Sequence, residues 1–343
     1  MTRETLETSI VARIVQHLPR KPAVDRPTDA ELIELSPADG WLLAVASDSV
    51  CEEIAAGLYA EPWLIGWMAV VSPVSDLAAA GAEILGVSLL MNLPRPLDPA
   101  VCEELARGAG DACRSLGTVT LGGDTSVSGE LTVGACALGL VRRDRVITRC
   151  GAREGDAIYL TGPAGLGNAY ALSRLDPSRT PQPLEFRPRP PVELGGLIAR
   201  HASCTIDTSD GVVAALDELA RVSPVGFDVT ARPEELLHVQ AVQECQRRDL
   251  PPWLALVGCH GEFEVLFTVA PQREETFLEA SRDQEFEPLR LGRAVARHGV
   301  ALAWDGAASV LDSGWLRNRA ATAAEDPRQY LDDLVDFARK VGQ

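Results

Sequence analysis

Short polar segments that contain an aspartate follow several apolar runs of this chain. Ala46–Ser49 (ASDS) ends the run Trp41–Val45, and Leu121–Ser126 (LGGDTS) ends a shorter one. Val74–Ala82 and Ile206–Gly211 combine serine or threonine with aspartate in the same way, next to an expected helix start. Ligand sites of α/β proteins gather at strand ends and helix starts. The recurrence therefore predicts an α/β (α+β) chain with several aspartates placed for a ligand site, although periodicity alone does not show that they converge.

The chemistry of these segments favours a phosphate bound together with a magnesium ion. Glycine lets a backbone approach a phosphate closely, and an adjacent aspartate can hold a Mg²⁺ that the phosphate shares. Each segment alone also has a purely structural interpretation, because a Gly-Gly-Asp turn or a helix N-cap needs no ligand. Clustered carboxylates, in contrast, repel one another unless a cation bridges them. In Val74–Ala82, Ser75 or Asp76 is expected to begin an alanine-rich helix that Gly81 helps to end.

Composition excludes two classes of partner. The 343 residues, 46% of them hydrophobic, are enough for two domains with cores of their own. The net charge of -17 disfavours binding to nucleic acid or to an anionic membrane surface. The first apolar segment, Leu6–Leu18, is interrupted by polar residues and is typical of an amphipathic helix rather than a signal peptide, and the sequence contains no transmembrane span. A cytoplasmic protein is expected.

The few lysines exclude two common ways of binding ATP. Lysine occurs only at Lys21 and Lys340, so the chain has neither a P-loop nor the strand lysine of protein kinases. Phosphate charge must then be met by metal ions, backbone donors and arginine. The eight cysteines form no Cys-x-x-Cys pair and are expected to be buried free thiols. Cys259 is the exception: His260 and Glu262 follow it, which leaves a reactive role open.

Taken in order, four segments resemble those of the thiamine-monophosphate kinases. They are Ser75–Ala82, Leu121–Ser126, Arg149–Gly162 and Asp207–Gly211, and the resemblance extends over roughly residues 8 to 316. These kinases belong to the superfamily of aminoimidazole ribonucleotide synthetase. The resemblance implies that superfamily's two-domain fold, in which the N-terminal sheets pair across a dimer into a shared β-barrel. It also implies ATP and Mg²⁺ as cofactors and a homodimer that acts on a small molecule.

The resemblance assigns candidate roles residue by residue. Positions that bind magnesium in the family are here Asp29, Ser47, Asp48, Asp76, Asp124, Asp207 and Asp210. Positions assigned to ATP are Ser47, Gly122, Gly123, Thr125, Arg149 and Ser209. Catalytic candidates are Asp124, Asp210 and Arg149, and candidates for substrate contact are Ala55, His260, Gly261, Glu262 and Trp315. Metal ions held by these acids would neutralise the phosphate chain.

The departures from the family lie mainly in the substrate half. Where the kinases have a glycine before a pair of acids, this chain has Pro27 and keeps only Asp29. Ala55 stands at the position of a histidine that helps to hold thiamine monophosphate in the family, and Cys259–Val265 replaces a second substrate motif. We therefore expect ATP- and Mg²⁺-dependent phosphotransfer to a different small molecule.

Two other functions stay open from the sequence. The first is a synthetase or dehydratase, in which ATP phosphorylates an amide or carbonyl oxygen so that this oxygen can leave. The second is a non-catalytic regulator that binds a nucleotide, which the missing glycine before Asp29 favours. A phosphorylated product would identify the kinase, and loss of water or ring closure would identify the synthetase or dehydratase. Tight ATP binding without turnover would identify the regulator.

The breaks in the pattern predict three parts: an ATP- and Mg²⁺-binding dimerisation domain over residues 1–148, an α/β domain over residues 149–316 and a charged helical tail over residues 317–343. Pro73 is expected to break or kink its helix. Arg187, in a proline-rich stretch, is expected to meet a phosphate or to belong to a rigid linker. Helices are predicted at Pro62–Ala82, Pro99–Leu116, Val192–His201, Gly211–Val222 and Tyr330–Val341, and strands at Glu31–Leu35, Trp41–Ser47, Ile84–Met91, Thr118–Leu121, Leu131–Leu140, Ala157–Thr161, Val225–Thr230, Glu262–Val269 and Leu289–Val295.

Overall fold

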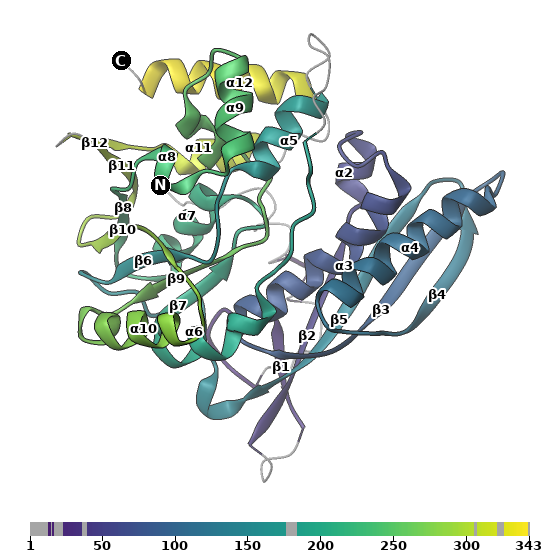
Figure 1. Cartoon of the computed structure of the whole chain (residues 1–343), viewed down its shortest axis with the longest axis horizontal. Coiled ribbons are helices and arrows are strands. Elements are labelled where there is room, and N and C mark those ends of the chain that lie inside the picture. Colours follow the sequence, from purple (N-terminus) through teal and green to yellow (C-terminus); the bar gives the residue numbers. More distant parts are fainter. Residues whose placement is uncertain are drawn as a thin grey trace.

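The computed structural model contains two α/β halves, each built on its own sheet (Figure 1). It describes residues 13–14, 16, 23–35, 40–175, 184–304, 307–320 and 326–341. The N-terminal sheet has five strands in the order β1-β2-β5-β3-β4, of which the β3–β4 pair is parallel and the other pairs are antiparallel. Its strands are β1 (Glu31–Glu34), β2 (Trp41–Ser49), β3 (Glu83–Pro94), β4 (Thr120–Ser128) and β5 (Thr132–Arg142).

Among the residues that the structure describes, three helices belong to this half: α2 (Cys51–Ala55), α3 (Pro62–Ala79) and α4 (Pro99–Ser115). Helix α3 is buried along most of its length because it contacts the sheet, α4 and strands of the second half. Glycines allow α3 and α4 to approach closely, since a Cβ on Gly66 would lie 2.0 Å from the carbonyl oxygen of Leu105. Helix α3 continues through Pro73, so of the expected break or kink, the break does not occur. Burial of the apolar residues around Pro73 outweighs a loss of about 3 kcal/mol from an interior proline.

The C-terminal sheet has seven strands in the order β12-β11-β8-β10-β6-β9-β7. The β8–β11 pair is parallel and the other pairs are antiparallel. Strands β6 and β9 are buried along their whole length, as expected for central strands of a sheet that helices cover. The strands are β6 (Ala157–Leu160), β7 (Ala202–Asp207), β8 (Gly226–Val229), β9 (Val265–Val269), β10 (Leu289–Val295), β11 (Gly299–Trp304) and β12 (Ala307–Val310).

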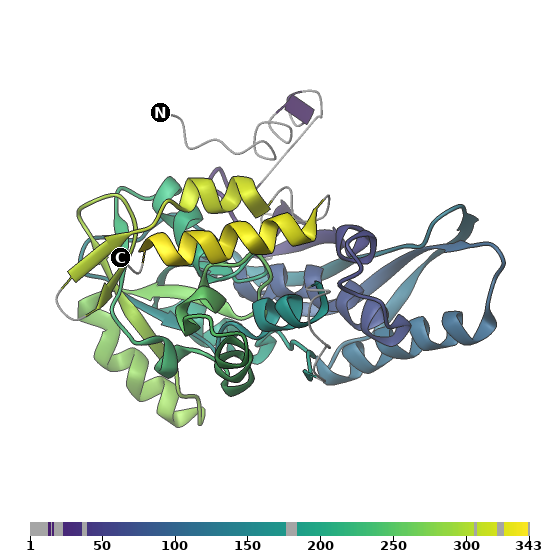
Figure 2. The ribbon, with the colours of Figure 1, turned by 90° about the horizontal axis from the view of Figure 1, so that it is seen from above.

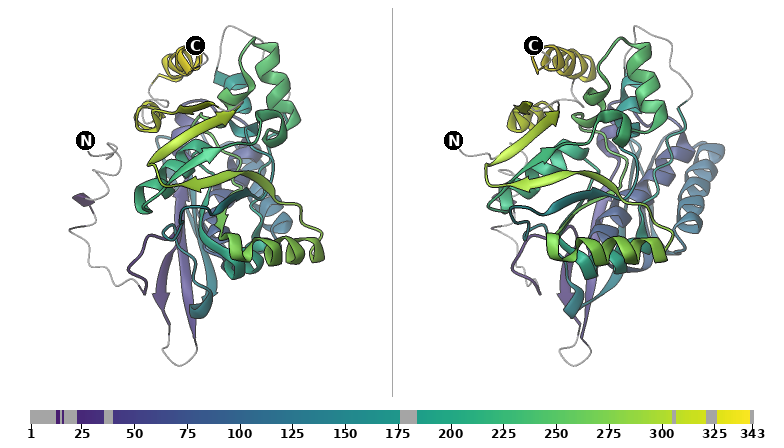
Figure 3. Two further views of the ribbon diagram at one scale, coloured as in Figure 1. Left: turned by 90° about the vertical axis from the view of Figure 1, so that its left-hand side faces the viewer. Right: turned by 60° about the vertical axis from the view of Figure 1, so that its left-hand side comes forward.

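Helices lie on both faces of this sheet, with α10 and α12 on opposite sides (Figure 3). On the α10 side, Phe277 packs edge to face on Phe267 with ring centroids 5.4 Å apart. The helices of this half are α5 (Leu166–Leu175), α6 (Gly195–His201), α7 (Val212–Val222), α8 (Pro233–Leu236), α9 (Val239–Arg247), α10 (Pro271–Asp283), α11 (Ser313–Ala320) and α12 (Pro327–Val341), with short 3-10 turns at η1 (Arg143–Arg145), η2 (Val192–Leu194) and η3 (Pro252–Leu256). No helix within the described residues is both long and apolar enough to cross a bilayer.

The C-terminal helix α12 is part of the core of its domain. Tyr330, Leu331 and Leu334 are buried in the large apolar cluster of the C-terminal half. Figure 2 shows α12, in yellow, lying beside α11 across this half of the molecule. The helix begins at Pro327, slightly earlier than predicted, and α11 crosses the predicted boundary between residues 316 and 317.

Two sequence segments are placed differently from expectation. The Gly-Gly-Asp segment lies inside β4 rather than after a strand, because Thr120–Ser128 continues to pair with β3. Ser75 and Asp76 lie near the end of α3 rather than at its start, and Gly81, with a φ of 68°, follows that end as expected. Within the described residues the N-terminal sheet is open, with β1 and β4 at its edges, so one chain forms no closed barrel. The predicted helix Leu6–Leu18 lies almost entirely outside the described residues.

Candidate active site

Three aspartates from separate parts of the chain meet between the two halves of the molecule. Asp29 precedes β1, Asp76 lies near the end of α3, and Asp207 is the last residue of β7. One carboxylate oxygen of each lies within 4.8 Å of the corresponding oxygens of the other two. We refer to Asp29, Asp76 and Asp207 as the aspartate cluster.

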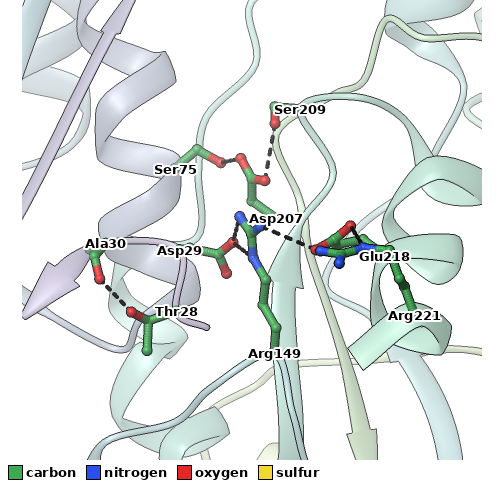
Figure 4. A network of polar contacts seen from close by, with 9 residues as sticks. All are labelled: Thr28, Asp29, Ala30, Ser75, Arg149, Asp207, Ser209, Glu218 and Arg221. Atoms are coloured by element: carbon green, nitrogen blue, oxygen red, sulfur yellow. Dashed lines mark hydrogen bonds and ion pairs between the residues drawn. The ribbon is translucent and has the colours of Figure 1, made fainter. Parts of the chain in front are cut away.

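Side chains around the aspartate cluster hold two of its members in place (Figure 4). The Nε of Arg149 donates to Asp29 Oδ1 at 2.6 Å. The hydroxyl of Ser75 donates to Asp207 Oδ2 at 2.7 Å, and that of Ser209 donates to Asp207 Oδ1 at 3.0 Å. The carboxylates therefore have fixed orientations, which a preorganised site requires.

The electrostatics of the cluster favour a bound cation. Burial raises the pKa of Asp29 to about 7, although Arg149 opposes the shift. Burial, together with the charge of Asp207, raises the pKa of Asp76 well above its usual value, and burial also raises that of Asp207. Three carboxylates facing one guanidinium leave an excess of negative charge in a buried place. Hard oxygen ligands with unbalanced charge suit a divalent cation such as Mg²⁺, so the residues present fit that ion.

Asp48 lies close to the aspartate cluster, and Asp210 follows Asp207 by three residues. Burial raises the pKa of Asp48 to about 6, and the charge of Asp207 adds to this shift. Burial also raises the pKa of Glu53 to about 7, and the charges of Asp48 and Asp210 add to this shift. Glu53 Oε2 is covered and has no hydrogen-bond partner among the described residues. Glu53 is not among the predicted site residues, and its only sequence signal is its place in the first helical turns after Asp48.

The Gly-Gly-Asp segment is not brought into the aspartate cluster. Asp124 is exposed on the edge strand β4, and the sheet register runs from Asp124 through Leu90 and Gly134 to Ser49. Three strand spacings separate Asp124 from Ser49, on the order of 14 Å along the sheet. Gly122, Gly123 and Thr125 are exposed beside Asp124, and a Cβ on Gly123 would lie 2.0 Å from the carbonyl oxygen of Leu89. This strand therefore presents its backbone and one carboxylate at the open edge of the sheet.

The loop Cys259–Glu262, which we call the substrate loop, lies directly beside the segment that carries Asp207. The amide of Gly261 donates to the carbonyl oxygen of Ser209 at 2.9 Å. The amide of His260 donates to Asn168 Oδ1 at 3.0 Å, and Glu262 Oε2 accepts from the amide of Gly165 at 2.7 Å. The predicted substrate residues of this loop thus lie beside the aspartate cluster.

The other two candidates for substrate contact lie on separate helices. Ala55 is exposed at the end of α2. Trp315 lies in α11, and one face of its ring stacks on Phe337 at 5.3 Å. The Arg319 guanidinium also lies over the Trp315 ring, 5.8 Å from the ring centroid. Trp315 is therefore engaged in contacts inside the C-terminal half.

A cavity of about 600 Å³ opens next to the substrate loop rather than over the aspartates. Glu262 and Glu264 line it from one side, and Arg187 and Arg189 line it from the proline-rich segment. Burial raises the pKa of Glu262 to about 8 and that of Glu264 to about 7. Arg187 itself lies 4.8 Å over the ring of Trp63.

All eight cysteines are free, as predicted. The predicted burial is correct for Cys113, Cys204 and Cys245, whereas the other five are half-buried. Burial raises the pKa of Cys259 to about 12, which keeps this side chain in the thiol form. A thiolate nucleophile at Cys259 is therefore not supported.

The protein is expected to lose stability at acidic pH because of the side chain of His260. Burial lowers its pKa to about 4, from 6.5 in the unfolded chain, and its Nε2 is covered without a partner among the described residues. Between these two values the unfolded state binds the proton and the folded state does not, so stability is present above pH 6.5 and is lost as the pH falls towards 4. Wild type is expected to lose up to about 3 kcal/mol more than His260→Gln over this window, measured by urea unfolding. Equal losses in the two proteins would contradict this assignment.

Comparison with known proteins gives the class to which this fold and site belong. The profile of the AIR synthase related protein N-terminal domain matches residues 27–141, and that of the C-terminal domain matches residues 153–305. The thiamine-monophosphate kinase of Halobacterium salinarum is 32% identical over 255 residues, which cover 73% of this chain and 82% of the relative. The thiamine-monophosphate kinase of Synechococcus elongatus is 30% identical over 278 residues, which cover 77% of this chain and 82% of the relative.

Solved structures show the same fold. Thiamine monophosphate kinase from Aquifex aeolicus superimposes with a TM-score of 0.70 at 23% identity, over 88% of this chain and 98% of that chain. The complex of AaThiL with AMPPCP and TMP has a TM-score of 0.68 at 22% identity, over 87% of this chain and 92% of that chain. The chain thus belongs to the AIR synthase-related family. Within it, the chain is a thiamine-monophosphate kinase-like member and an ATP-dependent kinase.

Proposed function

We propose that this protein transfers the γ-phosphoryl group of ATP, with Mg²⁺, to a small-molecule acceptor that differs from thiamine monophosphate. The observation that carries the proposal is the aspartate cluster. Its three carboxylates, of which Asp207 is buried and Asp29 and Asp76 are half-buried residues, share one site and face a single arginine. Such an arrangement is unfavourable without a cation and suits the metal-bound phosphates of ATP.

The residues around the site have distinct proposed roles. Asp29, Asp76 and Asp207, with Asp48, Asp210 and Ser47 beside them, would hold Mg²⁺, which would neutralise the charge of the phosphates. Arg149 orients Asp29 and contributes positive charge near the phosphates, while Ser75 and Ser209 fix the orientation of Asp207. The exposed edge strand with Gly122, Gly123, Asp124 and Thr125 would receive the remainder of the nucleotide. Residues 1–148 would thus supply most of the ATP and Mg²⁺ ligands, and Arg149, Asp207 and Ser209 of the second half would complete the site.

The acceptor side supports a changed specificity. Ala55 has no group that binds a heterocycle by hydrogen bonding, whereas the kinases have histidine at this position. Nearby, Glu53 places a covered carboxylate next to Asp48 and Asp210. The substrate loop presents His260 and Glu262 in place of the family's glycine and aspartate. An acceptor that donates hydrogen bonds or carries a positive charge fits this lining better than one that needs the histidine.

Product analysis tests the proposed function. Purified protein is incubated with Mg²⁺, ATP and a panel of small alcohols and phosphate monoesters that includes thiamine monophosphate, and products are identified by mass spectrometry. We expect one acceptor to gain a phosphoryl group, and thiamine monophosphate to react at least about tenfold more slowly, a difference of about 1.4 kcal/mol in transition-state stabilisation. Thiamine monophosphate as the best acceptor would contradict the altered specificity. A dehydrated or cyclised product would replace the kinase by a synthetase, and binding without ADP formation would indicate a regulator.

We also propose that two copies pair through the open edge of the N-terminal sheet. Exposed apolar side chains gather there, with Leu90 and Leu121 both 52% exposed and Val127 42% exposed. Soluble proteins normally cover such an edge. A variant that tests this interface must change one of these exposed residues. A residue such as Val133 on β5, which is only 2% exposed, belongs to the core of its own domain, and its substitution would test folding instead.

Leu121→Glu is expected to convert the dimer into a monomer and to lower ATP turnover at least about tenfold, because a charge in the paired edge is desolvated and the nucleotide lies close to it. Light scattering gives the mass and a coupled assay gives the rate. Val310→Glu is the control, since Val310 is 62% exposed on the other sheet. A monomeric wild type, or a Leu121→Glu protein that stays dimeric, would contradict the pairing.

A further inference from the structure

Four contacts from different elements fix the conformation of the substrate loop. The amide of His260 is bound by Asn168 of α5, and that of Gly261 by the carbonyl of Ser209. Glu262 caps the amide of Gly165 at the turn before α5. The fourth contact comes from α12, the C-terminal helix. The amide of Cys259 donates to the hydroxyl oxygen of Tyr330 at 2.8 Å.

The helix that supplies this fourth contact lies outside the part of the chain that the family profiles match. The C-terminal domain profile ends at residue 305, and α12 begins at Pro327. Tyr330 is 2% exposed, and its ring meets the His260 ring at an interplanar angle of 86° with centroids 6.3 Å apart. Tyr330 thus touches two consecutive residues of the substrate loop, one through its hydroxyl and one through its ring.

Packing determines where Tyr330 lies. Leu331 and Leu334, on the same helix, are buried in the core of the C-terminal half. Phe337 stacks on Trp315 and packs edge to face on Trp253. These apolar contacts anchor α12 over two further turns, so the Tyr330 hydroxyl is held by a rigid element rather than by a flexible tail.

We propose that Tyr330 is a positioning residue: it sets the backbone of the substrate loop and makes α12 a structural part of the acceptor site. This inference rests on the proposed function, because the loop is the proposed acceptor-binding segment. Tyr330 need not touch the acceptor. Without its oxygen, the covered amide of Cys259 would lose its acceptor and the loop would gain other conformations.

Hydrogen exchange on the full-length protein tests this role without an acceptor. In wild type the Cys259 amide should be strongly protected. Tyr330→Phe keeps the ring and removes only the acceptor oxygen. We expect the amides of residues 259–261 to exchange at least about tenfold faster in this variant, while α11, α12 and β9 keep their protection. The affinity for Mg²⁺ and AMPPCP should stay within about twofold of wild type, because α12 acts on the loop and not on the nucleotide.

Leu334→Ala is the matched control, since it weakens the packing of the same helix but leaves the Tyr330 oxygen in place. It should raise exchange in α12 at least as much as in the loop. Unchanged loop exchange in Tyr330→Phe, loss of α12 protection in that variant, or an unprotected Cys259 amide in wild type would each overturn the proposal. The wild-type measurement decides even where the variant fails to fold. If ATP turnover is absent but the exchange results hold, the proposed function fails and the positioning of the loop stands.

Discussion

Asp76→Asn is expected to lower ATP turnover at least about hundredfold, which corresponds to about 2.7 kcal/mol of barrier. Asp76 is half-buried near the end of α3, and its carboxylate oxygen lies within 4.8 Å of those of Asp29 and Asp207. Asparagine has nearly the same shape but removes one negative charge from the ligand set. Initial rates at several magnesium concentrations check the result.

The same variant is expected to stabilise the metal-free protein, although it lowers turnover. Removing one of three mutually repelling carboxylates should raise the melting temperature of the metal-free protein, and it should reduce the further rise that Mg²⁺ with AMPPCP produces. Asp283→Asn, an exposed carboxylate at the end of α10, is the control and should change none of these quantities. A lower metal-free melting temperature with an unchanged rate would show that Asp76 is structural and would exclude it as a metal ligand.

Gly261→Ala is expected to disrupt the substrate loop. A Cβ at Gly261 would lie 1.5 Å from the carbonyl oxygen of Thr208 and 2.8 Å from that of Ser209, so the backbone on one side must move. Because Asp207 and Ser209 belong to that neighbouring segment, the displacement reaches the aspartate cluster. We expect a loss of about 2 kcal/mol or more in unfolding free energy and at least about tenfold in turnover.

Gly196→Ala is the matched control for this substitution. Gly196 lies in α6, and a Cβ there would meet no heavy atom within 4 Å. Alanine at an exposed helix position should raise the unfolding free energy by about 0.5 to 1 kcal/mol and leave turnover unchanged. Urea unfolding and steady-state rates on the two variants make the comparison. Equal unfolding free energies and equal rates in the two variants would show that the close approach at Gly261 has no role in the site.

The sequence predicted the elements that local pattern determines. The continuous apolar run of β2 predicted this strand, and strands such as β5 and β10 lie close to the predicted ranges. The helices α2, α8, α9, α10 and α11 and the strands β11 and β12 were not predicted. Helix α10 illustrates the reason: it is polar over most of its length, and among its residues Phe277 and Ser281 are buried. Its position depends on tertiary packing against the sheet rather than on a strong apolar stripe.

The site was predictable in its residue types and less so in its grouping. The resemblance selected Asp29, Asp76 and Asp207 as metal positions, and the structure places these three together. The resemblance also grouped Asp124 with these three aspartates. Within one chain, however, Asp124 lies on β4, at the edge of the sheet opposite to β1, which Asp29 precedes. Ser75 and Glu53 could not be selected from the sequence, because their roles depend on residues of the other half. Ser75 donates to Asp207, and the charge of Asp210 acts on the Glu53 carboxylate. Tyr330, far along the chain and outside the shared motifs, has no local signal at all.

The aspartate cluster draws its members from both halves of the chain, two from the N-terminal half and Asp207 from the other. A ligand that binds all three therefore links two folding units thermodynamically. At a concentration one hundred times its dissociation constant, the ligand raises the free energy of unfolding by about 2.7 kcal/mol, and this increase applies to both units at once. Helix α3 already joins the two halves, because it packs against strands β7 and β9 of the second half. A ligand held by all three aspartates adds a polar link to this apolar one, so removing the ligand should lower the melting temperature of both halves together.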